Sequence, residues 1–351
     1  MDQETANTLF ERGGFLLFLD APENLEFGID YNSWNIGPRF KGVKLIPPWI
    51  HFVYYSVQDK TSQQHGLRSG FFHNFEAGKI LLKQWNPQIE DLFEDSELDP
   101  DQANRYKADI RYFDQFMGAY PLVPNDTYQT WLHLSNYLTR DLIEHHVPNS
   151  GKVSCVTGSG EDQLGEEKDE DGLEFTLIDL KKSFPEGASG DQLTKYSLDK
   201  SHLLETLLSK AYKSDYENLL GEFQLSFICL ILAQNFSGFN QWKKLIHLIC
   251  SSKETIIKRP KLIFDFLNVL KFQMEECPKD FFIDVISENN FLVPTLRTLI
   301  RNINDSDGVD TSIISILHEF QAFVSRKFDW YLTIEEEEEE EGEDAPVIVE
   351  L

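Results

Sequence analysis

The sequence predicts an α+β, multidomain protein: a β-rich, sandwich-like N-terminal domain followed by an all-α helical-bundle C-terminal domain. Before about residue 86, short aromatic and β-branched runs alternate with Gly, Pro and Asn. After about residue 100, apolar residues recur at spacings of three and four, as helices require. The 351 residues are 41% hydrophobic, which is enough for about two domains.

Five runs predict the strands: 13–20, 26–34, 49–57, 69–75 and 79–85. In WIHFVYYSV (49–57), Ile50, Phe52 and Tyr54 fall on one face, and the other face is also mainly apolar. Because a strand that is apolar on both faces must be covered on both, we expect a sandwich or a barrel. Segments 99–118 and 125–146 have helical spacing and are expected to be helices appended to this part.

The remainder predicts seven helices, near 197–212, 216–235, 238–251, 260–276, 279–288, 291–303 and 311–327. Ser214 to Glu217 and Ser251 to Glu254 each fit a capping box. Pro260 and Pro278 suit first-turn positions, where proline loses no hydrogen bond. Apolar faces on nearly every helix favour a compact bundle or a short solenoid.

We therefore divide the chain into a β-rich domain with appended helices (1–148), an acidic linker (149–176), a helical domain (177–333) and a tail (334–351). Residues 161–174 carry a net charge of −7 and residues 335–344 one of −9, out of −27 in all. Segments so polar cannot bury themselves and are expected to be disordered. Ser159 precedes Glu161 and Asp162, so it is a candidate phosphorylation site, although a solvated tether is the simpler interpretation.

Composition excludes several classes of function. A strongly acidic chain is a poor direct ligand for nucleic acid, which is bound through Lys and Arg. The N-terminus has acids where a signal peptide needs positive charge, and the longest apolar run, 227–233, is too short to span a bilayer. The four cysteines are expected to be reduced thiols. We expect a protein of the cytoplasm and nucleus that is a monomer when free and binds no membrane.

The common catalytic and metal-binding patterns are missing. Asn149 to Lys152 is not a P-loop, because the required earlier Gly is absent and Val153 follows the Lys. His145 and His146 end a helix, where interaction with the helix dipole is a simpler role than metal binding. The carboxylates occur as exposed runs, and none is predicted to be buried. We therefore predict no enzyme, no cofactor and no metal site.

Aromatic residues gather beside turn residues in EFGIDYNSW and its neighbours. Phe27, Tyr31, Trp34 and Phe40 lie next to Gly28, Asp30, Asn32, Gly37 and Pro38. A turn-rich strand pair with a rigid corner explains them. A peptide-binding surface is the alternative.

Four segments together resemble the Aar-two family of splicing factors. They are EFGIDYNSW with IGPRFKGVKLIPPWIHF (26–52), GEFQLSFICLILAQNFSGFNQWKKLIHLIC (221–250), DFFIDVISENNFL (280–292) and APVIVEL (345–351). The resemblance implies a β-rich domain followed by a helical one. It also implies a non-catalytic assembly chaperone of the U5 small nuclear ribonucleoprotein in pre-mRNA splicing.

By the same resemblance, the partner is the large U5 scaffold protein Prp-eight, bound through its RNase H-like and Jab/MPN-like domains so that the Brr-two helicase does not load prematurely. The partner-binding residues are expected in the tail: Pro346, Val347, Ile348, Val349 and Glu350. Three β-branched residues are too few to form a sheet alone, but they can add to the edge of a partner's sheet. A helical adaptor for sorting or signalling peptides, or an enzyme with no recognisable motif, stays the alternative.

Overall fold

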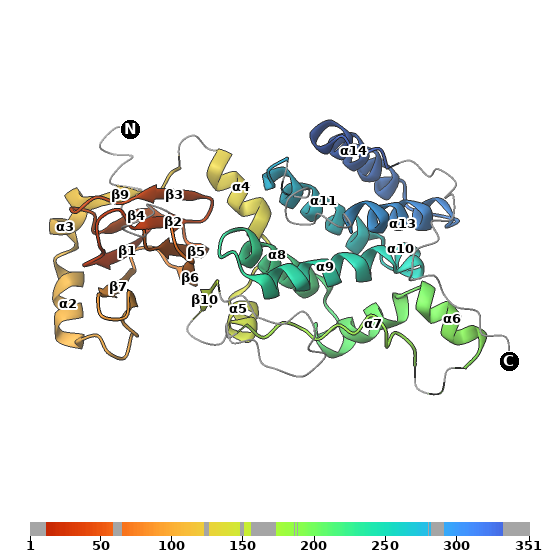
Figure 1. The fold of residues 1–351 in the computed structure, drawn as a ribbon, viewed down its shortest axis with the longest axis horizontal. Helices are drawn as coiled ribbons and strands as arrows, with labels where there is room; N and C mark the ends of the chain where they lie inside the picture. Colours follow the sequence, from red (N-terminus) through yellow and green to blue (C-terminus); the bar gives the residue numbers. More distant parts are fainter. Residues whose placement is uncertain are drawn as a thin grey trace. The chain divides into compact units, whose positions relative to one another are not determined.

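The computed structural model describes residues 12–58, 65–122, 126–147, 151–155, 173–185, 187, 189–279, 281 and 291–332. Its contacts divide the chain into two compact units: Met1–Ile178 with Leu208–Lys244, and Asp179–Leu207 with Leu245–Leu351. Figure 1 shows strands in the early part of the chain and helices in the later part. The predicted fold class is confirmed; the segment boundaries stay predictions.

Two five-stranded sheets make up the β part of the first unit. The first has the order β8-β7-β1-β4-β9, with parallel pairs β1–β7 and β4–β9, and the second has the antiparallel order β10-β6-β5-β2-β3. The strands are β1 (Gly14–Leu19), β2 (Glu26–Ile29), β3 (Asn32–Asn35), β4 (Gly42–Ile46), β5 (Trp49–Ser56), β6 (Ser69–Phe75), β7 (Ile80–Asn86), β8 (Asp91–Leu92), β9 (Met117–Ala119) and β10 (Lys152–Ser154).

A shared core shows that the two sheets form a sandwich. Leu16, Phe18 and Val43 from the first sheet lie in one buried cluster with Phe27 and Val53 from the second. The outer face of the first sheet is covered by α2 (Pro100–Ala108) and α3 (Ile110–Phe113), which share a second cluster with β1 and β7. The 3-10 turn η1 (Asp114–Phe116) follows α3. The single helix predicted at 99–118 is instead two shorter helices, α2 and α3, and the predicted range ends with η1 and the start of strand β9.

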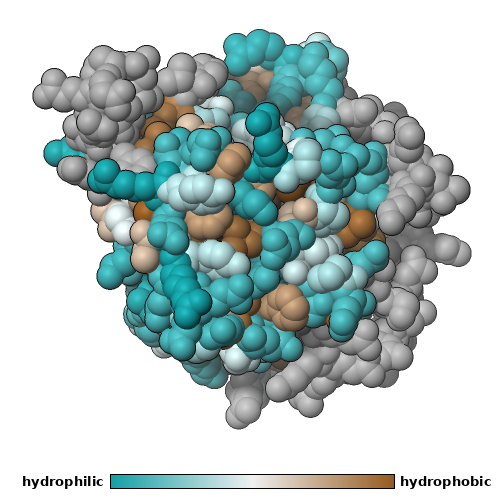
Figure 2. Space-filling model, turned by 90° about the vertical axis from the view of Figure 1, so that its left-hand side faces the viewer, coloured by the Kyte–Doolittle hydropathy of each residue, from teal (hydrophilic) through white to brown (hydrophobic). Residues whose placement is uncertain are grey.

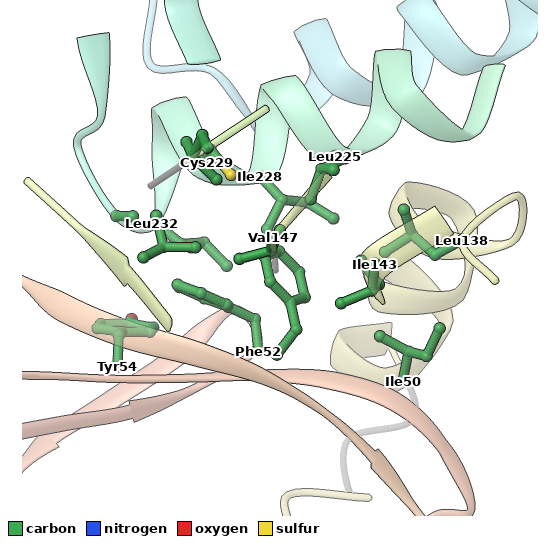
Figure 3. Packing of buried hydrophobic residues seen from close by; sticks show 14 of the residues in the cluster. Ile50, Phe52, Tyr54, Leu138, Ile143, Val147, Leu225, Ile228, Cys229 and Leu232 are labelled. Carbon is green, nitrogen blue, oxygen red and sulfur yellow. The ribbon is translucent and has the colours of Figure 1, made fainter. Parts of the chain in front are cut away.

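The outer face of the second sheet packs against helices, some of them far away in sequence. In Figure 3, Ile50, Phe52 and Tyr54 of β5 face Ile143 and Val147 of the α5 region and Leu225, Ile228, Cys229 and Leu232 of the α8 region. These helices are α4 (Asp126–Ser135), α5 (Arg140–His146) and α8 (Tyr216–Ile231). Strand β5 is thus buried on both faces, as its sequence predicts.

The remaining helices of the described residues all lie after residue 190. The helices are α6 (Asp191–Leu198), α7 (Ser201–Lys210), α9 (Phe236–Cys250), α10 (Lys253–Lys258), α11 (Pro260–Glu276), α13 (Leu292–Asn304) and α14 (Thr311–Phe328). Within the second unit, α11 packs on α14, and α10 contacts both α11 and α13. Pro260 starts α11, as predicted. The predicted helix 279–288 lies largely outside the described residues.

Both predicted capping boxes are wrong. Asp215, and not Ser214, caps α8, and its side chain accepts a hydrogen bond from the Glu217 N–H. At α10 the distant Asp199 takes the place of Ser251: its carboxylate accepts from the N–H groups of Lys253 (3.0 Å) and Glu254 (3.3 Å). A carboxylate is the stronger acceptor at a helix N-terminus, where the dipole favours negative charge. The sequence does not show that Asp199 lies there.

Both ends of the 149–176 segment carry structure that the sequence did not predict. Lys152–Ser154 pair with β6 as strand β10. At the other end Leu173 is buried and belongs to the core beneath α8. Residues 156–172, which include most of the acids and Ser159, lie outside the described residues.

Candidate partner-binding site

None of the site residues predicted from the sequence falls in the described part of the chain. Pro346, Val347, Ile348, Val349 and Glu350 lie beyond Leu332, the last described residue, and Ser159 lies between the described residues 155 and 173. Candidate sites in the described residues must therefore be found from their own geometry.

The aromatic corner is a strand pair, which was the simpler of the two predictions. Strands β2 and β3 pair antiparallel, with Phe27 opposite Trp34. Phe27 is buried against Phe40, with ring centroids 5.0 Å apart, whereas Trp34 is 43% exposed.

Among the coloured residues of Figure 2, which views the molecule from the side of α2 and α3, hydrophobic residues are scattered between hydrophilic ones. That view therefore gives no single wide apolar surface.

An apolar pocket of about 490 Å³ lies between β6, β7 and α5 in the first unit. Its apolar lining includes Ile50, Phe72, Phe75 and Ile143, and its charged lining is Glu76, Lys79, Arg140 and Glu144. His73 also lines it; burial, and then the nearby charge of Lys83, lower the pKa of His73 from 6.5 to about 4. A neutral imidazole and an apolar lining suit an apolar side chain of a partner better than a charged ligand.

A buried carboxylate organises the interior of the sandwich. Asp30 and His51 are fully buried, with Asp30 Oδ2 2.6 Å from His51 Nδ1, and the Tyr120 hydroxyl donates to the same oxygen at 2.5 Å. Asp30 Oδ1 accepts from the Phe52 N–H. His51 Nε2 lies 2.8 Å from the Pro47 carbonyl oxygen, which only accepts, so Nε2 carries a hydrogen. Burial, and then the Asp30 charge, raise the pKa of Tyr120 strongly.

These bonds join three separate parts of the unit. Asp30 has a left-handed backbone (φ 52°) in the turn after β2, His51 is on β5, and Tyr120 follows β9. The imidazole also stacks on Trp131 of α4, whose indole N–H donates to the Ile50 carbonyl oxygen. A carboxylate and an imidazole in this arrangement resemble part of a catalytic triad, but both His51 nitrogens already have partners within the fold. The cluster therefore holds the sandwich together.

A second buried carboxylate, Glu222 on α8, holds a distant segment of chain. Its Oε1 accepts from the Thr176 N–H (2.9 Å) and from Gln241 Nε2 (2.7 Å), and its Oε2 accepts from the Thr176 hydroxyl (2.7 Å). His146 Nε2 lies 3.4 Å from Oε2. The four residues His146, Glu222, Gln241 and Thr176 come from α5, α8, α9 and the segment after residue 172, respectively.

Sequence reasoning missed both clusters. It predicted no buried carboxylate, which is wrong for Asp30 and Glu222, each 0% exposed. It placed His146 at a helix end, which is correct, but missed that the ring is buried against Glu222 and the Glu174 carbonyl oxygen. A signal did exist for Glu222, since it stands among large apolar residues in GEFQLSFICL, where a helix leaves no polar face. Nothing comparable marks Asp30.

Within the described residues, no three His, Cys, Asp or Glu side chains are grouped as a metal site would require. The four cysteines are buried and free, as predicted. None of the described helices combines the length and apolarity needed to cross a bilayer.

The fold thus defines an α+β protein in which a β-sandwich with appended helices precedes a helical region. The family models match this order: the AAR2 N-terminal domain matches residues 12–148, and the AAR2 C-terminal repeat region matches residues 175–333. The chain therefore belongs to the AAR2 family, and the resemblance noted in the sequence is confirmed.

Curated relatives are similar in sequence to this chain along nearly its whole length. The chain is 34% identical to Protein AAR2 homolog of Homo sapiens, over all of this chain and 97% of that protein. It is 33% identical to the Caenorhabditis elegans homolog over 93% and 97% of the two chains. A more distant relative, 26% identical over 75% of this chain and 77% of its own, is named A1 cistron-splicing factor AAR2 of Saccharomyces cerevisiae.

Proposed function

We propose that this protein is a non-catalytic splicing factor that acts as an assembly chaperone of the U5 small nuclear ribonucleoprotein. The observation that carries the proposal is membership of the AAR2 family across both domains, together with the splicing-factor name of the yeast relative. The two buried carboxylates fit a scaffold role, because the fold itself occupies their hydrogen-bonding groups. We further propose a location in the cytoplasm and nucleus.

In this proposal the partner is the scaffold protein Prp-eight, bound through its RNase H-like and Jab/MPN-like domains, and binding blocks premature loading of the Brr-two helicase. Residues 346–350 add as a strand to the edge of a partner sheet, where main-chain hydrogen bonds give affinity and alternate side chains set the register. The glutamates at 335–341 keep the preceding segment solvated, because like charges repel. The pocket between β6, β7 and α5 is a second contact of the same partner.

Affinity purification of the intact tagged chain from a combined nuclear and cytosolic extract tests the proposal. We expect recovery of the U5 scaffold protein and depletion of the Brr-two helicase from the recovered complex. Recovery of membrane-traffic cargo in its place would favour the helical adaptor, and turnover of a small-molecule substrate would favour an enzyme.

A further inference from the structure

Residues Leu173–Ile178 lie against helices without forming a helix or a strand themselves. Leu173 and Ile178 are each 4% exposed, whereas Leu177 between them is 81% exposed. The segment is therefore bound along one side and open to solvent along the other, as an extended peptide is bound on a protein surface.

Side chains of the surrounding helices recognise the backbone of this segment. Glu222 accepts from the Thr176 N–H, and Gln241 Nε2 donates to the Thr176 carbonyl oxygen at 2.9 Å. Two residues earlier, the Glu174 N–H donates to the His146 carbonyl oxygen at 2.8 Å, and the Glu174 carbonyl oxygen lies 2.7 Å from His146 Nδ1. The backbone N–H and C=O groups of Glu174 and Thr176 are thus all paired. Three of the four partners are side-chain groups.

A buried hydroxyl lies next to these contacts. Tyr212 is 2% exposed, and within the described residues its hydroxyl lies near the Thr176 and Glu222 side chains without a hydrogen bond of ordinary geometry to either. Burial, and then the charge of Glu222, raise its pKa well above the ordinary value, so it stays a neutral donor beside this carboxylate. A buried hydroxyl without a well-formed hydrogen bond is unfavourable, and the Glu222 carboxylate beside it is a strong acceptor.

We propose that His146, Glu222 and Gln241 form a binding site for an extended peptide, and that Leu173–Ile178 occupies it as a detachable latch. When the latch leaves, the Tyr212 hydroxyl donates to the Glu222 carboxylate in place of Thr176. Opening the site then replaces one hydrogen-bond donor to Glu222 by another, so the buried carboxylate always has a partner.

The site selects the chemistry of its occupant. An occupant needs an apolar residue at the position of Leu173, an aromatic residue at that of Phe175, a hydroxyl at that of Thr176 and an aliphatic residue at that of Ile178. The aromatic and first apolar positions pack into the core under α8. The Thr176 hydroxyl donates to Glu222 Oε2 at 2.7 Å, whereas His146 Nε2 lies 3.4 Å from the same oxygen. This inference does not depend on the proposed function.

Hydrogen exchange of the intact chain tests the latch. Because opening breaks no helix or strand, the amides of Glu174 and Thr176 exchange faster than those of Leu225 in the middle of α8, and their rates do not follow the denaturant dependence of global unfolding. Thr176→Val removes one charge-assisted hydrogen bond and raises the exchange rates at 174–176 about tenfold or more. The matched control Leu177→Ala, in the exposed position, leaves them unchanged. Exchange of Thr176 in step with Leu225 would overturn the proposal.

Tyr212→Phe is expected to change the exchange rate of Thr176 in the opposite direction to Thr176→Val. If the hydroxyl serves the open state, its removal slows exchange at Thr176 and leaves the melting temperature unchanged or higher. Faster exchange together with a lower melting temperature would show that the hydroxyl stabilises the closed state, and would contradict the exchange of donors.

Binding in trans tests the site directly. A labelled peptide of residues 171–180 should bind the full chain carrying L173S, F175S and T176G at least tenfold more tightly than it binds the unaltered chain, whose own latch competes. Adding Glu222→Gln should weaken that binding. Equal binding to both chains, or no binding to a triple variant with native helical circular dichroism, would refute the site. If the triple variant does not fold, the exchange measurements above decide.

Discussion

Thr176 is joined to Glu222, 46 residues later, by two hydrogen bonds, one from its backbone N–H and one from its hydroxyl. The carboxylate is 0% exposed, so its charge is compensated by donors within the fold rather than by water. The contact fastens the chain after residue 172 onto α8.

Glu222→Ala is expected to destabilise the protein by about 2–4 kcal/mol. The change leaves the Thr176 N–H and one Gln241 donor without their acceptor in a buried place. Urea unfolding followed by circular dichroism measures the loss. Glu217→Gln, on the exposed first turn of the same helix, is the control and is expected to change stability by about 0.5 kcal/mol or less. A loss for Glu222→Ala as small as that of the control would contradict a structural role for the carboxylate.

Gly221→Ala is expected to destabilise the protein, although alanine favours a helix over glycine by about 1 kcal/mol. A Cβ at Gly221 would lie 2.6 Å from the Tyr137 carbonyl oxygen and 2.5 Å from Leu142 Cδ1, and the backbone oxygen cannot move aside cheaply. We expect a loss of about 1–3 kcal/mol from overpacking, measured by thermal unfolding. Gly37→Ala, where a Cβ meets nothing within 4 Å, should be nearly neutral. Stabilisation by Gly221→Ala would show that α8 does not approach so closely.

The strands and most helices could be predicted because local pattern determines them. WIHFVYYSV is apolar on both faces and is buried on both, and Pro260 marks the start of α11. Helix caps were less predictable, since Asp199 reaches α10 across more than fifty residues. No pattern in a single sequence reports such a distance.

The buried clusters could be predicted only in part. Glu222 interrupts an apolar helix and so could have been suspected. Asp30, by contrast, stands in a turn, where exposed Asp is common. Its burial results from the packing of His51, Tyr120 and Trp131, which come from three other parts of the chain.

Asp30→Asn tests the cluster inside the sandwich. Asn tolerates the left-handed backbone at this position, so the change removes charge and acceptor capacity without backbone strain. We expect a loss of about 2–3 kcal/mol, because Tyr120 donates to Asp30 Oδ2 and His51 Nδ1 lies 2.6 Å from the same oxygen. Urea unfolding of the single variants and of Asp30→Asn with Tyr120→Phe gives the coupling. Additive losses would mean that Asp30 and Tyr120 do not interact, which would contradict the hydrogen bond between them.

The pH dependence of stability should include a contribution from His73. Burial, and then Lys83, lower its pKa to about 4 in the folded chain, against 6.5 in the unfolded chain, while Asp95 and Glu76 act in the opposite sense and His51 lowers it slightly. Between these values the unfolded chain binds more protons, so this contribution is complete above about pH 6.5 and is lost as the pH falls towards 4. His73→Asn should therefore show a smaller drop in melting temperature from pH 7 to pH 5 than the unaltered chain. An equal drop in both would assign the effect to other groups.

The dissociation rate of the complex with the RNase H-like and Jab/MPN-like domains of Prp-eight tests the proposed function most directly. It should be measured by biolayer interferometry for the intact chain, for deletion of residues 345–351 and for Ile348→Pro, which removes a backbone donor that a paired strand needs. We expect the intact chain to bind, and both variants to dissociate at least tenfold faster with unchanged thermal unfolding of the free protein. Dissociation of both variants as slowly as the intact chain would refute strand addition by the tail, and absence of binding by the intact chain would refute the proposed function itself.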